Sequence, residues 1–240
     1  MSELLFVVDY DGTLARENEK ADPSIVESLS SLKQRSGFKL ALATARPLSD
    51  IEAFVPLSVF DAMVLELGSV VYLSSREVVF KPRVWGRILE RISREVPSVN
   101  RGEVLYYFDQ DSLKVAEKVA SGLGEAPLEL KKVGSRTYVF APKGLDKGVG
   151  LARLLRLTGW SGIRVVAIGD SASDLPLFQQ AWTRVAVANA DEKVKEAADL
   201  VTNGEYGNGV IEAVRKIVGK KQLKFSSLSE DAQQRKYEGY

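Results

Sequence analysis

The stretch Leu4-Leu5-Phe6-Val7-Val8-Asp9-Tyr10-Asp11-Gly12-Thr13 decides the fold, because an apolar run ends directly in two carboxylates. Five consecutive apolar residues predict a buried strand, which places Asp9 and Asp11 at its carboxyl end. In an open α/β sheet that edge is where ligands bind, and two acids separated by one residue suit a metal site with an acid or nucleophile role. The alternative is an ordinary turn, since Asp and Gly are common turn residues.

The elements that follow predict a parallel sheet covered by helices. Asp22 and Pro23 open a helix with a cap and a first-turn proline, and strands and helices then alternate along the chain. We expect helices over 23–32, 48–54, 147–157, 175–181 and 191–198, strands over 38–43, 64–65, 70–73, 78–80, 165–168 and 185–187, and a last apolar segment over 210–218.

Between Lys81 and Pro142 the pattern changes to a small α+β arrangement. Here we expect helices over 84–96 and 112–122 and strands over 104–108, 128–132 and 137–140. The chain is therefore predicted to have a core of residues 1–80 and 143–220, an inserted domain of residues 81–142, and a polar tail of residues 221–240.

Composition narrows the range of partners and of chemistry. The 240 residues are 45% hydrophobic, with 33 basic against 32 acidic side chains, which disfavours nucleic acid and anionic membranes as partners. No apolar run reaches the length of a membrane span and the N-terminus is not signal-like, so we expect a cytoplasmic protein; the oligomeric state stays open. Cys and His are both missing, which excludes thiolate chemistry and favours an all-oxygen Mg²⁺ site.

A second acidic loop, Gly169-Asp170-Ser171-Ala172-Ser173-Asp174, also follows an apolar strand. It should lie on the same sheet edge as Asp9 and Asp11. Four carboxylates that converge without His or Arg neighbours would repel one another unless a divalent cation lay among them. The alternative is that Asp174 caps a helix and Asp170 closes a turn.

Two further residues suit an anionic ligand. Thr44 ends another apolar strand, where its hydroxyl and the following amide could hold a phosphate oxygen, or where it could cap a helix. Lys147 begins a helix, a position that the helix dipole disfavours for a cation, so an anionic partner is indicated. The alternative for Lys147 is a solvated surface side chain.

Together, Asp9-x-Asp11-Gly12-Thr13, Thr44, Lys147 and Gly169-Asp170-x-x-x-Asp174 resemble, in this order, the four motifs of the haloacid dehalogenase-like superfamily of phosphohydrolases. The resemblance covers residues 4–210 and implies a Rossmann-like parallel-sheet core with a small α+β cap inserted at residues 81–142. The place of the insertion resembles the branch of sugar phosphatases and archaeal-type phosphoglycolate phosphatases, and the short cap favours the latter. Ser173 and Leu67 depart from that branch, which usually has Asn at both positions.

The resemblance implies a mechanism and a substrate class. Asp9 would be the nucleophile that forms an aspartyl-phosphate, and Asp11 the acid and base. Asp9, the Asp11 carbonyl oxygen and Asp170 would hold Mg²⁺, with Asp174 bound directly or through water. Thr44 and Lys147 would bind the phosphoryl group of a small phosphate ester. Alternatives are a phosphatase for a sugar phosphate or mannosyl-3-phosphoglycerate, and a catalytically silent Mg²⁺-binding interaction module.

Overall fold

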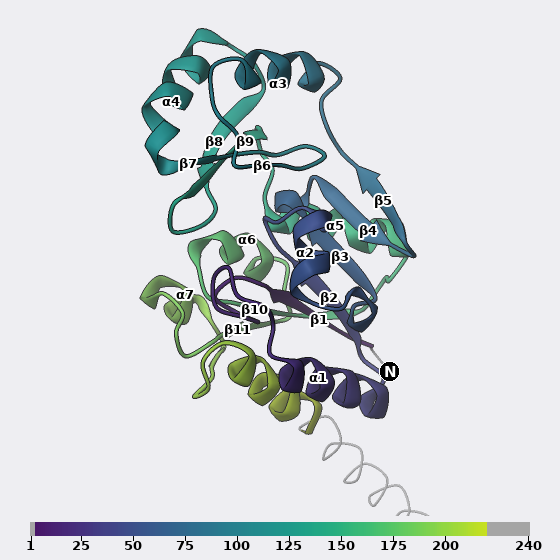
Figure 1. The fold of residues 1–240 in the computed structure, drawn as a ribbon. Helices are drawn as coiled ribbons and strands as arrows, with labels where there is room; N and C mark the ends of the chain where they lie inside the picture. The colour runs from purple at the N-terminus through teal and green to yellow at the C-terminus, as the bar shows by residue number, and fades with distance from the viewer. Residues whose placement is uncertain (1–2, 220–240) are drawn as a thin grey trace, which may run out of the picture.

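An eight-stranded sheet forms the centre of the computed structural model, which describes residues 3–219 (Figure 1). Its strands are β1 (Leu4–Asp9), β2 (Lys39–Ala43), β3 (Ala62–Leu65), β4 (Val70–Leu73), β5 (Arg76–Val79), β10 (Arg164–Gly169), β11 (Thr183–Ala186) and β12 (Leu200–Val201). Their order is β12-β11-β10-β1-β2-β3-β4-β5, parallel from β12 to β3 and antiparallel beyond it. The predicted α/β fold is confirmed, with the carboxyl end of β1 lying between those of β2 and β10.

Helices pack around this sheet. They are α1 (Pro23–Ser36), α2 (Leu48–Phe54), α5 (Lys147–Thr158), α6 (Leu175–Phe178), α7 (Glu192–Ala197) and a helix over 206–219, with 3₁₀ turns η1 (Leu57–Val59), η2 (Glu66–Gly68) and η4 (Ala172–Asp174). Asp22 caps α1 as expected, accepting a hydrogen bond from the Ser24 amide at 2.8 Å. The helix runs one turn further than predicted because Gly37, at φ 64°, is the residue that ends it. Figure 1 shows α1 beside the last helix.

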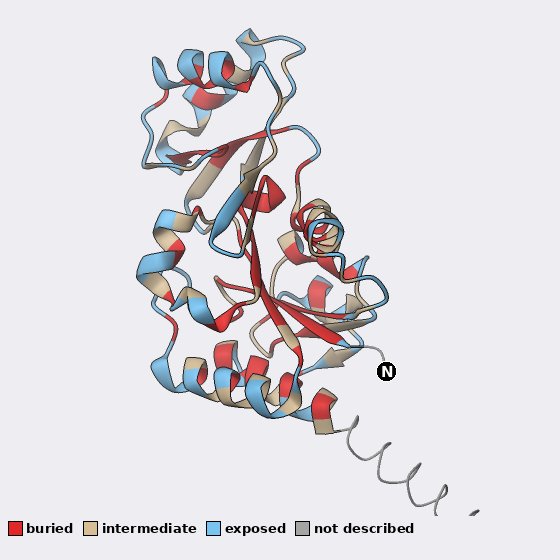
Figure 2. Ribbon diagram, turned by 90° about the vertical axis from the view of Figure 1, so that its right-hand side faces the viewer, coloured by how far each residue is buried: buried red, intermediate tan, exposed pale blue. Residues whose placement is uncertain are grey.

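A second sheet lies beyond the carboxyl edge of the first. It contains β6 (Asn100–Arg101), β7 (Tyr106–Asp109), β8 (Leu128–Lys132) and β9 (Thr137–Pro142), in the antiparallel order β6-β7-β9-β8. α3 (Trp85–Ser93) and α4 (Leu113–Gly122), the latter after the turn η3 (Gln110–Ser112), cover its outer face (Figures 1 and 2). Buried side chains from both sheets share one large hydrophobic cluster, and a smaller cluster contains Tyr107, Val139 and Ala141 of the second sheet. The division into core and inserted domain stays a prediction.

Glu66 ties the second sheet to the first. Its carboxylate is 1% exposed and accepts hydrogen bonds from the amides of Glu103, Val104 and Leu105 at 2.8, 2.9 and 2.7 Å. The strand predicted over 104–108 is therefore wrong at its start. Because these amides turn toward Glu66 instead of a neighbouring strand, β7 begins only at Tyr106.

The turn that carries Glu66 has an unusual backbone. Glu66 and Leu67 have φ values of 49° and 54°, in the left-handed region that side chains with a Cβ rarely adopt. Asn tolerates that region better than Leu, which explains why Asn would suit position 67. Leu67 instead packs into an apolar cluster with Leu105, just before β7, and Tyr107 within it. Leu at position 67 is thus less suited to the turn than Asn, but it provides an apolar contact between the two sheets.

Other differences from the prediction concern short elements. The helix predicted over 175–181 ends at Phe178, and the helix predicted over 84–96 spans only Trp85–Ser93. β6 and β12 have two residues each and leave no periodic signal in the sequence. The tail predicted over 221–240 lies outside the described residues.

Replacing Glu66 with Gln should weaken the attachment of the second sheet. The substitution keeps the shape of the side chain but puts an NH₂ group against a backbone N–H, so we expect the free energy of unfolding to fall by about 2 kcal/mol. Urea denaturation followed by circular dichroism measures this, with Glu90→Gln on the exposed face of α3 as the control. An E66Q protein as stable as E90Q would contradict this role.

Candidate active site

Three carboxylates meet around one buried ammonium at the carboxyl ends of β1 and β10. Oxygen atoms of Asp9, Asp170 and Asp174 lie within 4.8 Å of one another. The Lys147 Nζ is 2.6 Å from Asp9 Oδ1 and 2.7 Å from Asp174 Oδ1. Lys147 is 2% exposed, so it is not the surface lysine that its sequence position also allowed.

The two acidic loops are held together by hydrogen bonds and by one glycine. Gly12 has φ 84°, and a Cβ there would lie 2.2 Å from Asp170 Oδ2. Only glycine therefore lets the first loop come this close to the second. The Thr13 hydroxyl donates to Asp170 Oδ1 at 2.7 Å, and Asp174 Oδ2 accepts from the amides of Asp170 and Ser171 at 3.1 Å each. Asp174 thus shapes its own loop while contacting Lys147.

Close packing of α5 brings Lys147 into the cluster. Asp146 caps the helix by accepting from the Val149 amide at 2.8 Å. One turn into the helix, Gly150 faces Gly68 of η2 so closely that a Cβ on Gly68 would lie 2.6 Å from the Gly150 Cα. Two facing glycines therefore let the start of α5 reach the ends of β1 and β10.

Burial and the neighbouring charges shift the pKa values of the groups in this cluster. Burial raises the pKa of Asp9 well above its ordinary value, the charge of Asp174 raises it further, and Lys147 offsets this only in part. Burial and then Asp174 raise the pKa of Asp170 from 3.8 to about 6. Burial alone would lower the pKa of Lys147, but the charges of Asp174 and Asp9 outweigh it and the pKa is raised.

This arrangement fits a divalent cation. Three ionised carboxylates against one ammonium leave two negative charges uncompensated, which is the charge that one such ion supplies. Carboxylate oxygens are ligands that hard cations prefer. Asp9, Asp170 and Asp174 would hold the ion, and a contribution from the Asp11 carbonyl oxygen stays a prediction.

Asp11 does not join this cluster with its carboxylate, contrary to the expectation of four converging acids without an Arg neighbour. Arg46 binds both of its oxygens, from Nε to Oδ2 and from Nη2 to Oδ1, each at 2.7 Å. Asp11 and Arg46 line a cavity of about 250 Å³ together with Asn100 and Tyr107 of the second sheet. The carboxylate of Asp11 therefore faces the space between the two sheets.

Thr44 lies at the end of β2 and is 1% exposed. Its hydroxyl oxygen accepts a hydrogen bond from the Arg46 amide at 3.1 Å. The alternative of a helix cap is wrong, because α2 begins later and has Pro47 at its N-cap. A role of Thr44 in phosphate binding stays a prediction.

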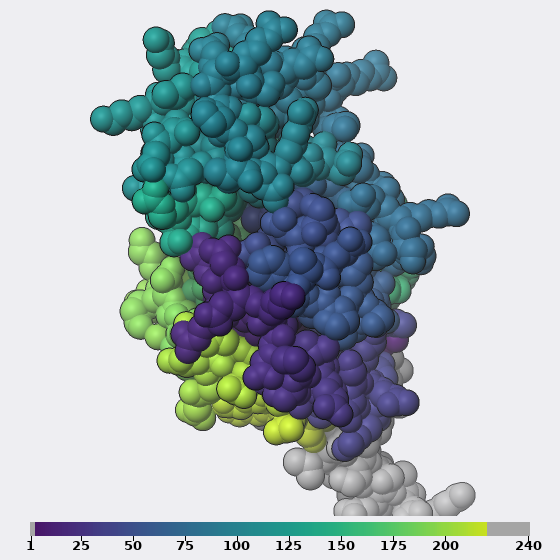
Figure 3. Space-filling model, viewed as in Figure 1, coloured from purple at the N-terminus to yellow at the C-terminus, as the bar shows by residue number. Residues whose placement is uncertain are grey.

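Three residues near the site were not among the predicted site residues. Arg46 lies two residues after Thr44, which follows β2. Asn189 donates to the Gly12 carbonyl at 2.7 Å and accepts from the Tyr206 amide at 2.9 Å, holding the first acidic loop from behind. Glu17 accepts from the Ser135 amide at 2.7 Å, so the chain between β1 and α1 contacts the loop between β8 and β9, as Figure 3 shows.

Ser173 is the second residue that stands where the resembling branch usually has Asn. Its hydroxyl lies 3.0 Å from that of Ser171. The contact keeps the hydroxyl within the second acidic loop.

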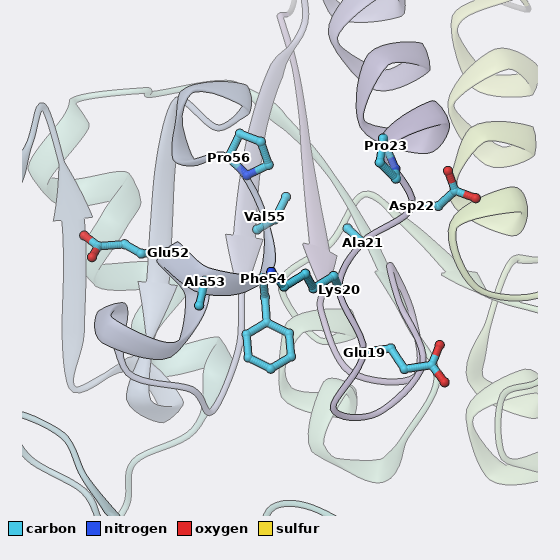
Figure 4. A pocket seen from close by; sticks show the side chains of 10 residues that line it. All are labelled: Glu19, Lys20, Ala21, Asp22, Pro23, Glu52, Ala53, Phe54, Val55 and Pro56. Atoms are coloured by element: carbon cyan, nitrogen blue, oxygen red, sulfur yellow. The ribbon is translucent and has the colours of Figure 1, made fainter.

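A second hollow lies away from the acidic cluster, between residues 19–23 and residues 52–56 (Figure 4). The carboxylates of Glu19 and Glu52, which line this hollow, point away from each other. None of the helices within residues 3–219 combines the length and apolar character needed to cross a membrane.

The raised pKa of Asp170 predicts how stability depends on pH and metal. The Asp170 carboxyl group holds its proton more tightly in the folded state than in the unfolded state. Protonation of Asp170 therefore stabilises the folded state below about pH 4, and this stabilisation is lost as the pH rises through about 6. We expect the Tm of metal-free protein to fall across this window and Mg²⁺ to raise it at pH 7 but not at pH 4.

Asp170→Asn should reduce both effects, while Asp111→Asn in the exposed turn η3 should leave them unchanged. Thermal melts at constant ionic strength measure this, and equal pH profiles for wild type and D170N would contradict it.

Known proteins resemble this chain over most of its length. The profile of the haloacid dehalogenase-like hydrolases matches residues 6–121 and 102–214. The chain is 31% identical over 229 residues to phosphoglycolate phosphatase 2 of Saccharolobus solfataricus, covering 90% of this chain and 93% of the relative. It is 30% identical over 227 residues to phosphoglycolate phosphatase of Methanopyrus kandleri, covering 89% and 97%.

The crystal structure of the Thermoplasma acidophilum protein 0175 has the same fold. It superposes with a TM-score of 0.72 at 19% identity, covering 91% of this chain and 99% of that one. Fold, motif order and sequence similarity agree, and the chain belongs to the haloacid dehalogenase-like hydrolase family.

Proposed function

We propose that this protein is a Mg²⁺-dependent phosphomonoester hydrolase that acts through an aspartyl-phosphate on Asp9. The observation that carries the proposal is the buried contact of Asp9 with Lys147 inside an acidic cluster, next to a cavity lined by Asp11. Nucleophile, phosphate-binding cation and acid then lie at one edge of one sheet.

In the first step a carboxylate oxygen of Asp9 attacks phosphorus and the bond to the leaving oxygen breaks. Asp11 supplies the proton that the leaving alkoxide needs. In the second step Asp11 takes a proton from water, the water oxygen attacks phosphorus, and the bond to Asp9 breaks. Asp9 returns to its carboxylate form and phosphate leaves.

Fixed charges would stabilise the phosphoryl group during both steps. Lys147 is already held by Asp9 and Asp174, so no reorganisation is needed when charge develops at phosphorus. The Thr44 hydroxyl, at the end of the neighbouring strand, would donate to a phosphoryl oxygen. A bound Mg²⁺ at Asp9, Asp170 and Asp174 would neutralise phosphoryl charge that Lys147 alone leaves uncompensated.

The substrate we propose is phosphoglycolate, because two relatives that match about nine tenths of this chain carry that name. The second candidate is a sugar phosphate, which the amide groups of Asn18 and Asn100 in the cavity favour, since amides bind hydroxyl groups well. Hydrolysis of phosphoglycolate, sugar phosphates and p-nitrophenyl phosphate in parallel separates these candidates. No turnover of any ester would favour a silent Mg²⁺-binding module. A cytoplasmic location stays a prediction.

Asp9→Asn should remove nearly all turnover, because an amide is a poor nucleophile. Asp11→Asn should retain phosphate binding but lose on the order of 10²- to 10⁴-fold in kcat. Asp111→Asn serves as the control for loss of a carboxylate outside the site. Borohydride trapping and peptide mass spectrometry should find the label on Asp9, and label on another residue would overturn the assignment.

Activity should disappear in chelator, return with Mg²⁺ and be inhibited by Ca²⁺. Mg²⁺ keeps octahedral geometry, whereas Ca²⁺ accepts about 6 to 8 oxygens and tolerates bidentate carboxylates. Binding both oxygens of Asp9 would hinder its attack. Titration of Ca²⁺ into an assay supported by Mg²⁺ measures this, and stimulation by Ca²⁺ or full activity in chelator would speak against it.

A further inference from the structure

The cavity next to Asp11 has one basic side chain among its lining residues in the part of the chain that the structure describes. That side chain is Arg46, and the acids Asp11, Glu17 and Asp50 lie around it. Because Asp11 is the proposed proton donor, the leaving group of the substrate must enter this cavity. Arg46 is therefore the cation that an anionic leaving group would meet.

The guanidinium of Arg46 makes a bidentate contact with Asp11. Its Nε and Nη2 bind the two oxygens of Asp11, and Nη2 also donates to Asn18 Oδ1 at 2.7 Å. Its guanidinium carbon lies 4.5 Å from the centre of the Phe54 ring, and Nη1 lies 3.5 Å from Asp50. The side chain is 14% exposed. This geometry suits a carboxylate, and the carboxylate that it holds is Asp11.

The other two acids of the cavity have partners from the second sheet. Asp50 accepts from the Asn100 amide group at 2.9 Å, and Glu17 accepts from the Ser135 amide. A carboxylate on either residue would repel an anionic group placed beside it. An anionic leaving group therefore has one favourable place in the cavity, at Arg46.

The contact between Arg46 and Asp11 conflicts with the proposed role of Asp11. While both oxygens of Asp11 accept from the guanidinium, the carboxyl group is not directed at a leaving oxygen. A carboxylate of the substrate can replace Asp11 with hydrogen bonds of the same kind and number. A hydroxyl group cannot, and would leave a largely buried guanidinium with a weaker acceptor.

We infer that Arg46 is a specificity-determining residue that binds a carboxylate on the leaving alcohol and thereby frees Asp11 for the leaving oxygen. The preferred substrates are then phosphate esters of short hydroxy acids. The inference rests on the proposed phosphatase function. The exchange breaks no covalent bond, because one carboxylate takes the place of another on the same guanidinium.

The test compares phosphoglycolate with 2-hydroxyethyl phosphate, which has a hydroxymethyl group in place of the carboxylate. Arg46→Gln should lower the kcat/KM ratio of the two esters by about 10- to 100-fold, because a charged hydrogen-bonding partner is lost for one substrate only. Inhibition by glycolate should weaken by about 10-fold or more in the same variant. Arg136→Gln, which removes an equal charge from a residue bound to Asp109 outside the cavity, should leave the ratio unchanged.

Each outcome decides between a specificity role and a positioning role. Equal loss for both esters, with glycolate inhibition intact, would show that Arg46 only positions Asp11 and would overturn the inference. If R46Q does not fold by circular dichroism, Arg46→Lys keeps the charge without the bidentate contact and should still lower the ratio; an unchanged ratio would overturn the inference. Wild-type protein that hydrolyses both esters equally leaves the phosphatase function standing and refutes this inference, whereas no hydrolysis of any ester refutes the function itself.

Discussion

The structure depends on one constraint, which is that a single buried ammonium contacts more carboxylate charge than it can compensate. Lys147 lies between Asp9 and Asp174, with Asp170 beside them, and none of these charges would be buried alone. Parallel strands bring the acids to one edge, Gly12 lets their loops approach, and the start of α5 brings in the lysine. The remaining negative charge makes the same cluster suited to a divalent cation, and in the proposed mechanism that cation and Lys147 together offset the charge of a phosphoryl group.

The second sheet adds a cavity beside the acidic cluster, which restricts what can bind there. Glu66 attaches it to the first sheet at one point, and Glu17, which lines the cavity, contacts it at another. Residues from both sheets line this cavity. Asp11 and Arg46 follow strands of the first sheet, and Asn100 and Tyr107 belong to the second. In the proposed function, the reaction type depends on the strand ends of the main sheet, and the choice of leaving group depends on the cavity where the two sheets face each other.

The main sheet and the acidic loops were predictable because each buried strand is a continuous apolar run that ends in a polar residue. β7 was placed too early because Val104 and Leu105 are apolar, yet their amides bind a side chain distant in sequence. The pairing of Arg46 with Asp11 was missed for the same reason, since periodicity reports local structure and carries no information on which loops meet. The available signals were the charged residues just beyond strand ends, which are Arg46, two residues after Thr44, and Glu66, directly after β3.

The position of the metal tests the central claim most directly, which is that the charge deficit around Lys147 is balanced by one divalent cation. Crystals grown with Mn²⁺, measured at the manganese absorption edge, would give its position independently of any assay. We predict one anomalous peak per chain, in contact with Asp9 and Asp170 and lost in Asp170→Asn. A peak at Asp50 or Glu17 in the cavity, or no peak near Asp9, would contradict the claim.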